Sequence, residues 1–536
     1  MSIDFGTDHG GGRKRHNQLK RVFLGVLMGI ALAGCTYSSS EYQRFETNAL
    51  RDTGDTRLGQ GVAPLVSDEL GNSGFVPLAN GLDAFVARLA LVEVADKSID
   101  VQYYLFHDDS TGRLLTAYLL RAANRGVRVR VLLDDMDMGG RDAGLSAIVQ
   151  HPNVQVRLFN PFPIRGMRFL NFITHFGTVT RRMHNKSFTV DNQVTIVGGR
   201  NIGDEYFDAA QGVNFGDMDL LSIGPVVRQV SDAFDEYWNS DLTLPASSFD
   251  LPSDPEFITR SKALLNKELA SLSESAYGRR LEESKLVEKL EAGSLDVFWA
   301  PADLFYDRPD KVRSEPGDRT SHLGPELSDL FASVENDLFL VSPYFVPGKQ
   351  GTALLKSLVE RGCRVTVLTN SLAATDVPAV HGGYARYRTE LLESGVEIYE
   401  MPPTKNTASH PNRLGTSQAS LHAKTMVFDQ KRVMVGSMNL DPRSNLLNTE
   451  MGILVESSEM AGAVSDWREH ALPEIAWRVE LERVEDPAPF SSQQRLRWIS
   501  LEDGQLIRLE QHEPEAGFWD RVQAAISRLL PIERQL

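Results

Sequence analysis

The sequence predicts an α/β protein made of two duplicated domains, each a mixed, mostly parallel sheet flanked by helices. One observation is a motif that begins at His184 and again at His422. A second is the similar order of strand and helix patterns before each copy. A third is the nearly constant offset between the copies, since Gly126 corresponds to Gly362. A repeat of this length indicates duplicated domains, and alternating strands and helices favour right-handed crossovers.

Hydrophobic periodicity places the elements of the first copy in order. Residues 85–95 have helical spacing, residues 99–106 are typical of a strand, and residues 112–124 are typical of a helix. Gly126 then leads into a second strand that ends at Leu133, and a further helix and the strand 154–159 precede the motif.

The second copy repeats this order of elements. It comprises a strand at 338–345, a helix at 352–360, a strand from Cys363 to Leu368, a helix at 384–393 and a strand at 396–399. Helical residues rich in Glu, Lys, Leu and Ser join the two copies, and their charges indicate a solvated face. The predicted divisions are a signal segment (1–35), a polar tether (36–80), the first domain (81–250), a helical linker (251–293), the second domain (294–485) and a tail with an amphipathic helix (486–536).

Each motif copy reads H-x-K, four residues, Asp, six residues, G-x-x-N. Its chemical residues are His184, Lys186, Asp191 and Asn201 in the first copy and His422, Lys424, Asp429 and Asn439 in the second. We expect a strand, a turn at the Asp, a second strand and a loop opened by Gly. His and Lys then share one face of an extended strand. Asp is a natural turn former, so we interpret both aspartates as structural support within the candidate catalytic set.

These residue types suit phosphodiester transfer. A neutral imidazole is a nucleophile and its conjugate acid is a proton donor, so two histidines can divide the two roles. The lysines would supply positive charge, and the asparagines amide donors, to the non-bridging phosphate oxygens. The scheme needs no metal and no cofactor, and the sequence contains no H-E-x-x-H or paired C-x-x-C spacing.

The duplicated motif resembles the signature of the phospholipase D superfamily, in which a carboxylate downstream of each motif holds a histidine in its working tautomer. The candidates are Asp217 and Glu450, and Asp219 stays open beside Asp217. The flanks at 198–207 and 441–452 resemble bacterial cardiolipin synthases, most closely the C-type branch, from about Leu82 onward. The resemblance implies two domains related by a pseudo-twofold axis with the active site between them.

The resemblance also implies phosphatidyl transfer to phosphatidylglycerol, with His184 as nucleophile. The donor would be phosphatidylglycerol or phosphatidylethanolamine. The alternatives are a phospholipase D-type hydrolase of phospholipids and a non-catalytic scaffold, and intact motifs in both halves argue against the scaffold. The net charge of −16 argues against a nucleic-acid substrate. Nothing in the sequence identifies a protein partner.

The N-terminus predicts membrane attachment. A basic segment precedes the apolar run 22–33, and the ending Leu32-Ala33-Gly34-Cys35 resembles a bacterial lipobox. We expect cleavage after Gly34 and lipidation of Cys35, with an uncleaved anchor as the alternative. Either outcome places the protein in the periplasm or on the outer face of the inner membrane, and Thr36 leaves the choice of membrane open. Cys363 is expected to be a buried thiol, without a disulfide framework.

Two further stretches have residue patterns that suit lipid contact. Residues 159–180 mix aromatic residues with arginines, which is typical of a membrane-facing mouth or, equally, of a buried helical hairpin. Residues 518–530 carry an apolar helical stripe, which favours an interfacial helix over a helix docked on the body.

Overall fold

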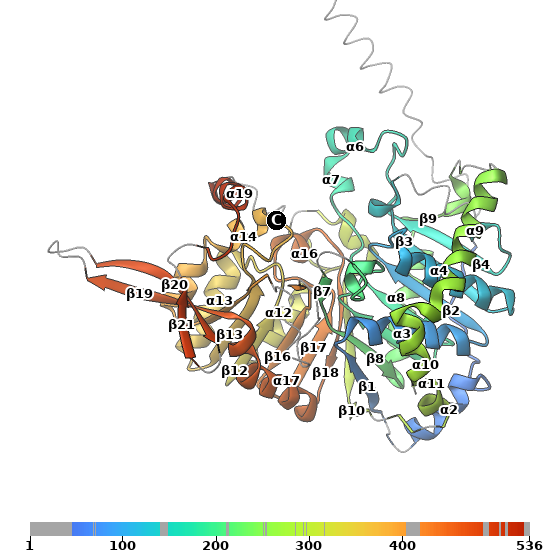
Figure 1. Cartoon of the computed structure of the whole chain (residues 1–536), viewed down its shortest axis with the longest axis horizontal. Coiled ribbons are helices and arrows are strands. Elements are labelled where there is room, and N and C mark those ends of the chain that lie inside the picture. The colour runs from blue at the N-terminus through green and yellow to red at the C-terminus, as the bar shows by residue number, and fades with distance from the viewer. Residues whose placement is uncertain are drawn as a thin grey trace, which may run out of the picture.

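The computed structural model describes residues 45–529 with short gaps, and Figure 1 shows its course. The gaps are residues 68, 70, 140–147, 211–213, 250, 252–254, 285, 293, 296, 316, 404–418, 486–491, 503–504 and 510–512. The expected signal peptide and Cys35 lie outside the described residues. Within the described ranges, no helix combines the length and the apolar character that crossing a bilayer requires.

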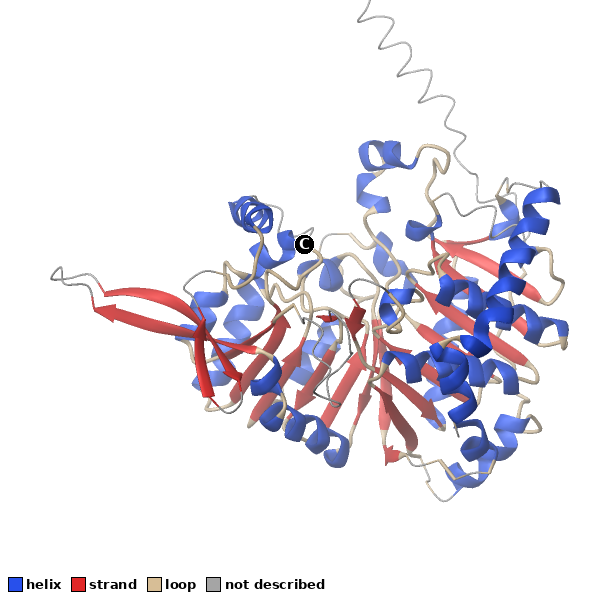
Figure 2. Cartoon of the chain, viewed as in Figure 1, coloured by secondary structure: helices blue, strands red, loops and turns tan. Residues whose placement is uncertain are grey.

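Two large sheets lie next to each other, with helices on their outer faces (Figure 2). The first sheet contains β1 (Ser73–Leu78), β2 (Ser98–Tyr103), β3 (Arg128–Asp134), β4 (Val154–Phe159), β5 (Ser187–Val190), β6 (Val194–Gly198), β8 (Asp219–Ile223), β9 (Thr243–Pro245) and β10 (Phe298–Ala300), in the order β10-β1-β8-β6-β5-β2-β3-β4-β9. The second contains β11 (Ala302–Tyr306), β12 (Asp337–Val341), β13 (Arg364–Asn370), β14 (Glu397–Met401), β16 (Thr425–Phe428), β17 (Arg432–Gly436), β18 (Met451–Val455), β19 (Trp477–Glu485), β20 (Ser492–Glu502) and β21 (Gln505–Leu509), in the order β11-β18-β17-β16-β12-β13-β14-β19-β20-β21.

The duplication is visible in the strand order. In the first half β8-β6-β5-β2-β3-β4 are neighbours, and β18-β17-β16-β12-β13-β14 are their counterparts. Gly126 and Gly362 precede the equivalent strands β3 and β13, and both adopt positive φ (100° and 92°), which glycine tolerates best. The predicted α/β fold of two duplicated domains with mixed sheets is confirmed.

The expected predominance of parallel strands is wrong. Parallel pairing joins only β2, β3 and β4, and β12, β13 and β14, among the described strands of the two sheets. These strands are connected through helices such as α4 (Ser110–Asn124) and α13 (Gly348–Glu360). The motif strands instead form tight hairpins, β5 with β6 and β16 with β17, and a hairpin connection makes its strands antiparallel.

The other described helices surround these sheets. They are α2 (Arg57–Ser67), α3 (Gly81–Val94), α6 (Arg168–Thr174), α7 (Phe176–Val179), α8 (Pro225–Asn239), α9 (Pro255–Ser271), α10 (Ala276–Glu283), α11 (Leu286–Glu291), α12 (Gly324–Ala332), α14 (Pro378–Tyr384), α15 (Arg388–Glu393), α16 (Pro442–Leu446), α17 (Ser458–His470), α18 (Leu472–Ile475) and α19 (Phe518–Leu529). Helices α9, α10 and α11 occupy the residues of the expected linker, and they pack on α4, α3 and α2 of the first half, where Tyr277 joins the buried core. The change from one sheet to the other comes at Pro301, because β10 pairs with β1 and β11 pairs with β18.

The two halves share an apolar core. Val197 and Leu220 of the first sheet belong to the same buried cluster as Phe339, Val427 and Val433 of the second. Burial of apolar area is the main favourable term in such an association. The interface therefore fixes the position of the two motif hairpins relative to each other.

The expected tether at 36–80 is wrong for residues 45–80, the part that the structure describes. Leu58 and Val62 of α2 are buried in the first core, and Phe75 of β1 is fully buried where β1 pairs with β8. The prediction failed because Gly59, Gly61 and Pro64 in α2, and Gly74 and Pro77 in β1, are residues that usually mark loops.

The second sheet also continues beyond the predicted domain end at 485. Strand β19 pairs with β14, and β20 and β21 extend the same sheet. The predicted helix in the tail is present as α19. It packs on α14, and a buried network links the chain before it to the body, since Arg388 pairs with both Glu400 (2.7 Å) and Glu513 (2.6 Å).

Candidate active site

The aspartate of each motif lies in a tight turn at the far end of the motif strand. Asp191 and Asn192 have φ of 51°, and Asp429 and Gln430 have φ of 53°. The Asp191 carboxylate accepts hydrogen bonds from the backbone N–H groups of Asp96, Lys97 and Ser98 at 2.7–2.9 Å. Asp429 does the same for Glu335, Asn336 and Asp337. Both aspartates thus secure the start of the neighbouring strand.

The motif histidines are paired with carboxylates from the opposite half. His184 Nδ1 lies 2.8 Å from Glu450 Oε2, and His422 Nδ1 lies 2.6 Å from Asp217 Oδ2. Both carboxylates are fully buried. The alternative candidate, Asp219, instead pairs with Arg88 at 2.9 Å. The sequence singled out both carboxylates but carried no sign of this exchange.

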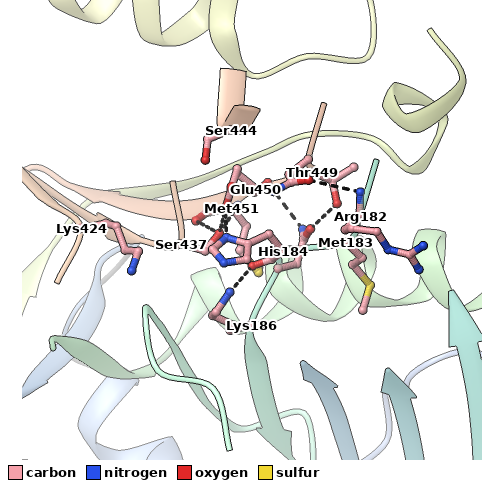
Figure 3. Close-up of polar contacts among 12 residues, drawn as sticks. Arg182, Met183, His184, Lys186, Lys424, Ser437, Ser444, Thr449, Glu450 and Met451 are labelled. Carbon is pink, nitrogen blue, oxygen red and sulfur yellow. Dashed lines mark hydrogen bonds and ion pairs between the residues drawn. The ribbon is translucent and has the colours of Figure 1, made fainter. Parts of the chain in front are cut away.

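The backbone repeats the same exchange. The N–H of His184 donates to the carbonyl of Thr449, the residue before Glu450 (2.8 Å). Figure 3 shows His184 next to Thr449, Glu450 and Ser437 of the second half. The N–H of His422 donates to the carbonyl of Gly216, the residue before Asp217 (2.7 Å). Strands β7 (Asn214–Gly216) and β15 (Ala419–Leu421) pair in parallel at this second crossing. Each histidine is therefore fixed relative to its carboxylate through the chain as well as the side chains.

The small residues of the G-x-x-N segments differ between the halves. In the second half Ser437 donates its hydroxyl to Glu450 Oε2 at 2.5 Å. In the first half Gly199 occupies the equivalent place, and a Cβ there would collide with the Asp217 carboxylate. The two supporting carboxylates therefore have different surroundings, although the strands that hold them are equivalent.

The two lysines belong to one electrostatic site. Lys186 Nζ donates to the His184 carbonyl at 2.6 Å, and Lys424 Nζ lies 2.9 Å from His422 Nδ1. Burial, together with the positive charge of Lys424, lowers the pKa of Lys186 to about 7, although Glu450 opposes the shift. Burial lowers the pKa of Lys424 to about 8 against the pull of Asp217 and Glu450. Because each lysine senses charges from the opposite half, the predicted residues of both copies are brought together.

Both histidines are neutral in the free protein near pH 7. Burial and the two lysine charges lower the pKa of His184 to about 4, although Glu450 raises it in part. Burial, Lys424, Lys186 and His184 hold the pKa of His422 well below its usual value. Burial acts to raise the pKa of Glu450, but its contacts with His184, Lys186 and the Ser437 hydroxyl outweigh burial and hold this pKa below its usual value. Burial raises the pKa of Asp217.

Aromatic side chains surround the two imidazoles. The Tyr104 ring lies edge-on to His184 at 5.1 Å, and Tyr206 and Phe215 lie 5.2 and 5.1 Å from His422. Tyr104 could be anticipated, because it and Tyr344 lie near the ends of the two matching strands that the sequence predicts at 99–106 and 338–345. Tyr206 and Phe215 could not, since Tyr206 ends a short 3-10 helix and Phe215 lies in β7, and no local pattern places either one beside His422.

The motif asparagines lie in the site with their amides positioned differently. Asn201 Oδ1 accepts the N–H of Leu105 at 3.2 Å, which leaves the NH₂ group as its donor. Asn439 is buried, and its carbonyl oxygen has no hydrogen-bond partner within the described residues. Nearby Arg443 donates to the carbonyl of Thr180 at 2.9 Å, and so ties α16 to the segment before the first motif.

Two groups of side chains in the described ranges are close enough together to share a metal ion. They are His107, Asp109 and Glu205, and His381, Glu400 and Glu513. Neither contains a motif histidine. The expectation that the chemistry needs no metal stays a prediction.

The duplicated sheets and the paired histidine hairpins define a phospholipase D-like protein. The family described as "Cardiolipin synthase, PLD-like domain" matches residues 89–238 and 327–471, more than half of the chain. The sequence is 43% identical over 481 residues to cardiolipin synthase C of Escherichia coli (strain K12), covering 89% of this chain and 99% of that one. It is 27% identical to cardiolipin synthase A of Pseudomonas syringae pv. syringae (strain B728a), covering 74% of this chain and 67% of that one.

A solved structure supports the fold. The phosphatidylserine synthase of Haemophilus influenzae Rd KW20 superposes with a TM-score of 0.51 at 15% identity, covering 77% of this chain and 91% of that one. The chain belongs to the phospholipase D-like cardiolipin synthase family, and it is an enzyme.

Asp191 provides a test of the structural role of the motif aspartates. Asp191→Ala removes the acceptor of three backbone N–H groups, so we expect a loss of about 3 kcal/mol in unfolding free energy. Asp191→Asn keeps an acceptor and tolerates positive φ, and should lose less than half of that. Denaturant unfolding and the turnover of the folded fraction are the measurements. A fully stable Asp191→Asn protein with turnover reduced about a hundredfold would make Asp191 a chemical participant.

The lysine pKa values predict the pH dependence of kcat/KM. Below about pH 4 His184 is protonated and cannot attack; above about pH 7 Lys186, and above about pH 8 Lys424, lose the proton that gives them positive charge. Lys186→Arg, which stays charged, should move the onset of the alkaline fall from about 7 to about 8, with a plateau roughly tenfold lower because the guanidinium fits differently. Lys356→Arg, at a half-buried position on α13 where the lysine pairs with Glu390 outside the site, is the control. An unchanged alkaline limb would exclude Lys186 as its source.

Proposed function

We propose that the protein synthesises cardiolipin by transferring a phosphatidyl group to phosphatidylglycerol through a phosphohistidine. The observation that carries the proposal is the exchanged pair of histidine–carboxylate contacts, His184 with Glu450 and His422 with Asp217, beside two buried lysines. The similarity to an Escherichia coli cardiolipin synthase over most of both chains supports the lipid substrates.

In the first half-reaction His184 attacks phosphorus. Nδ1–H of His184 donates a hydrogen bond to the Glu450 carboxylate, which leaves the Nε2 lone pair for the attack. The bond from phosphorus to the headgroup oxygen breaks, and His422 protonates that oxygen. Lys186 and Lys424 stabilise the negative charge on the non-bridging oxygens. In the second half-reaction His422 removes the proton of the terminal phosphatidylglycerol hydroxyl, which attacks phosphorus and releases His184.

The choice of His184 as nucleophile rests on the difference between the carboxylates. The pKa of Glu450 is held low, so it is an anion beside His184 and stabilises the positive charge of a phosphohistidine. Burial raises the pKa of Asp217, the partner of His422. This unequal support favours the division of roles that the family resemblance implies.

Substrate binding also favours the protonated form of His422, the form that acts as the acid. In the free site the lysines hold the pKa of His422 well below its usual value. A bound phosphodiester places a negative charge beside both lysines, and this charge raises the proton affinity of His422. The acid is then protonated when a phosphate is present to receive attack.

Transfer to an alcohol requires that water compete poorly. His184 and His422 are 8% and 7% exposed, and Tyr104, Tyr206 and Phe215 cover their rings. This enclosure favours a transferase over the phospholipase D-type hydrolase. We further propose lipidation at Cys35, which would hold the enzyme at a periplasmic membrane surface next to its substrates.

Assay of the full chain with defined lipids tests the function. With phosphatidylglycerol alone, and with added phosphatidylethanolamine, we expect cardiolipin, and mass spectrometry of released glycerol or ethanolamine identifies the donor. His184→Ala and His422→Ala should each reduce turnover by about a thousandfold or more. Phosphatidic acid as the sole product would show that the protein is a hydrolase and not a synthase.

A substrate with a good leaving group distinguishes the role of the nucleophile from that of the acid. Phosphatidyl-p-nitrophenol needs little protonation, so Asp217→Asn, which weakens the acid His422, should retain at least a third of the burst of p-nitrophenol. Glu450→Gln weakens the nucleophile, and should reduce the burst rate by about a hundredfold. The opposite ranking of the two variants would reverse the roles of His184 and His422.

A further inference from the structure

The segment before the first motif buries several polar side chains and exposes most of its large apolar ones. Asn171 of α6 is fully buried, and its side chain bonds to both backbone groups of Ile164 (3.0 and 2.8 Å). Arg165 and Arg168 turn inward to the buried Asp135. The large apolar side chains point outward and form what we call the α6–α7 surface: Met167, Phe169, Phe172, Ile173 and Phe176, with Phe169 64% and Ile173 77% exposed.

The terminal helix α19 is inverted in the same way. It packs on α14 through its small residues Ala524 and Ser527, and Gly382 is needed there because a Cβ would collide with both. The opposite side carries the α19 surface, which consists of Phe518, Trp519, Ile526 and Leu529; Trp519 is 70% and Leu529 85% exposed. An ordinary surface helix buries its large apolar residues against the body. The exposed apolar side of α19 therefore indicates a binding partner.

The two surfaces project from the same edge of the molecule. In Figures 1 and 2, α6 and α19 stand beyond the body at the upper edge, with α16 and β7 between and below them. Strand β7 pairs with β15 just before His422, and Arg443 of α16 bonds to Thr180 at the end of the α6–α7 segment. In the view of Figure 1 the elements next to the active site thus lie between and below the two helices that carry the apolar surfaces.

We propose that the α6–α7 and α19 surfaces insert together into the outer layer of a lipid bilayer and place the active site over it. A bilayer is a flat partner that meets two separate projections at once, whereas a second copy of this chain would have to match two separated projections. Aromatic and aliphatic residues of this kind suit the membrane interface. Exposed Arg521 and Arg528 on α19 fit the anionic headgroup of phosphatidylglycerol. The inference rests on the proposed function for the identity of the lipid.

Insertion of α19 can be read from Trp519. The full chain with His184→Ala, which leaves the lipids intact, is reconstituted in vesicles of phosphatidylglycerol and phosphatidylethanolamine with or without brominated acyl chains. Among the six tryptophans, Trp238, Trp477 and Trp498 are buried. We expect brominated chains to quench fluorescence, and Trp519→Phe to remove more than half of that quenching. Equal fluorescence in both kinds of vesicle would overturn the proposal. This holds also if the protein forms dimers in solution, which would make a second copy of the chain the partner of the two surfaces.

Substitutions on each surface test the link to activity. Phe169→Glu with Ile173→Glu, and Ile526→Glu with Leu529→Glu, should each reduce activity on vesicles about tenfold and leave activity on detergent-dispersed lipid unchanged. Gln523→Glu, exposed on α19 but outside the α19 surface, is the matched control and should change neither. Equal losses in both formats, or none, would refute the docking role. Failure of the proposed function is separate, because it would abolish cardiolipin formation in every format without affecting the quenching.

Discussion

The exchange of carboxylates between the halves is the constraint on which the site depends. Neither motif is complete within its own domain, since Glu450 of the second half orients His184 and Asp217 of the first orients His422. The apolar interface, with Val197 and Phe339 among its members, holds the two hairpins at the required separation. The catalytic pairs therefore form only when the two halves pack against each other, and damage to the interface core should affect both histidines together.

The same exchange concentrates charge in a buried place. Two lysines, two carboxylates and two imidazoles lie beneath aromatic rings, and isolated charges there would be costly. The carboxylates partly balance the lysines, yet both lysine pKa values remain low. In the free enzyme the positive charges of the two lysines are therefore only partly balanced, and the site favours binding of an anion. A phosphodiester satisfies it, so the electrostatic strain of the free enzyme favours the substrate that it acts on.

Much of this could be predicted from the sequence, because the motif hairpins are local structures. The predicted strand at 154–159 coincides with β4, and Asp191 forms the expected turn because Asp tolerates its positive φ. The pairing of His184 with Glu450 could not be predicted, since the residues are 266 positions apart and no local pattern marks a contact. Helix α2 and β1 were missed because glycine and proline obscured their periodicity. The stripe on α19 was visible, but a stripe alone does not show which side of a helix packs on the body.

The difference between the supporting carboxylates has a consequence for the origin of the chain. Two identical polypeptides related by a twofold axis could build the same exchanged contacts, but both imidazoles would then have the same environment. Joining the copies in one polypeptide released each half to change separately, to Gly199 with Asp217 on one side and Ser437 with Glu450 on the other. Covalent fusion thereby permits a lasting division of labour that a symmetric dimer would have to establish anew in every catalytic cycle.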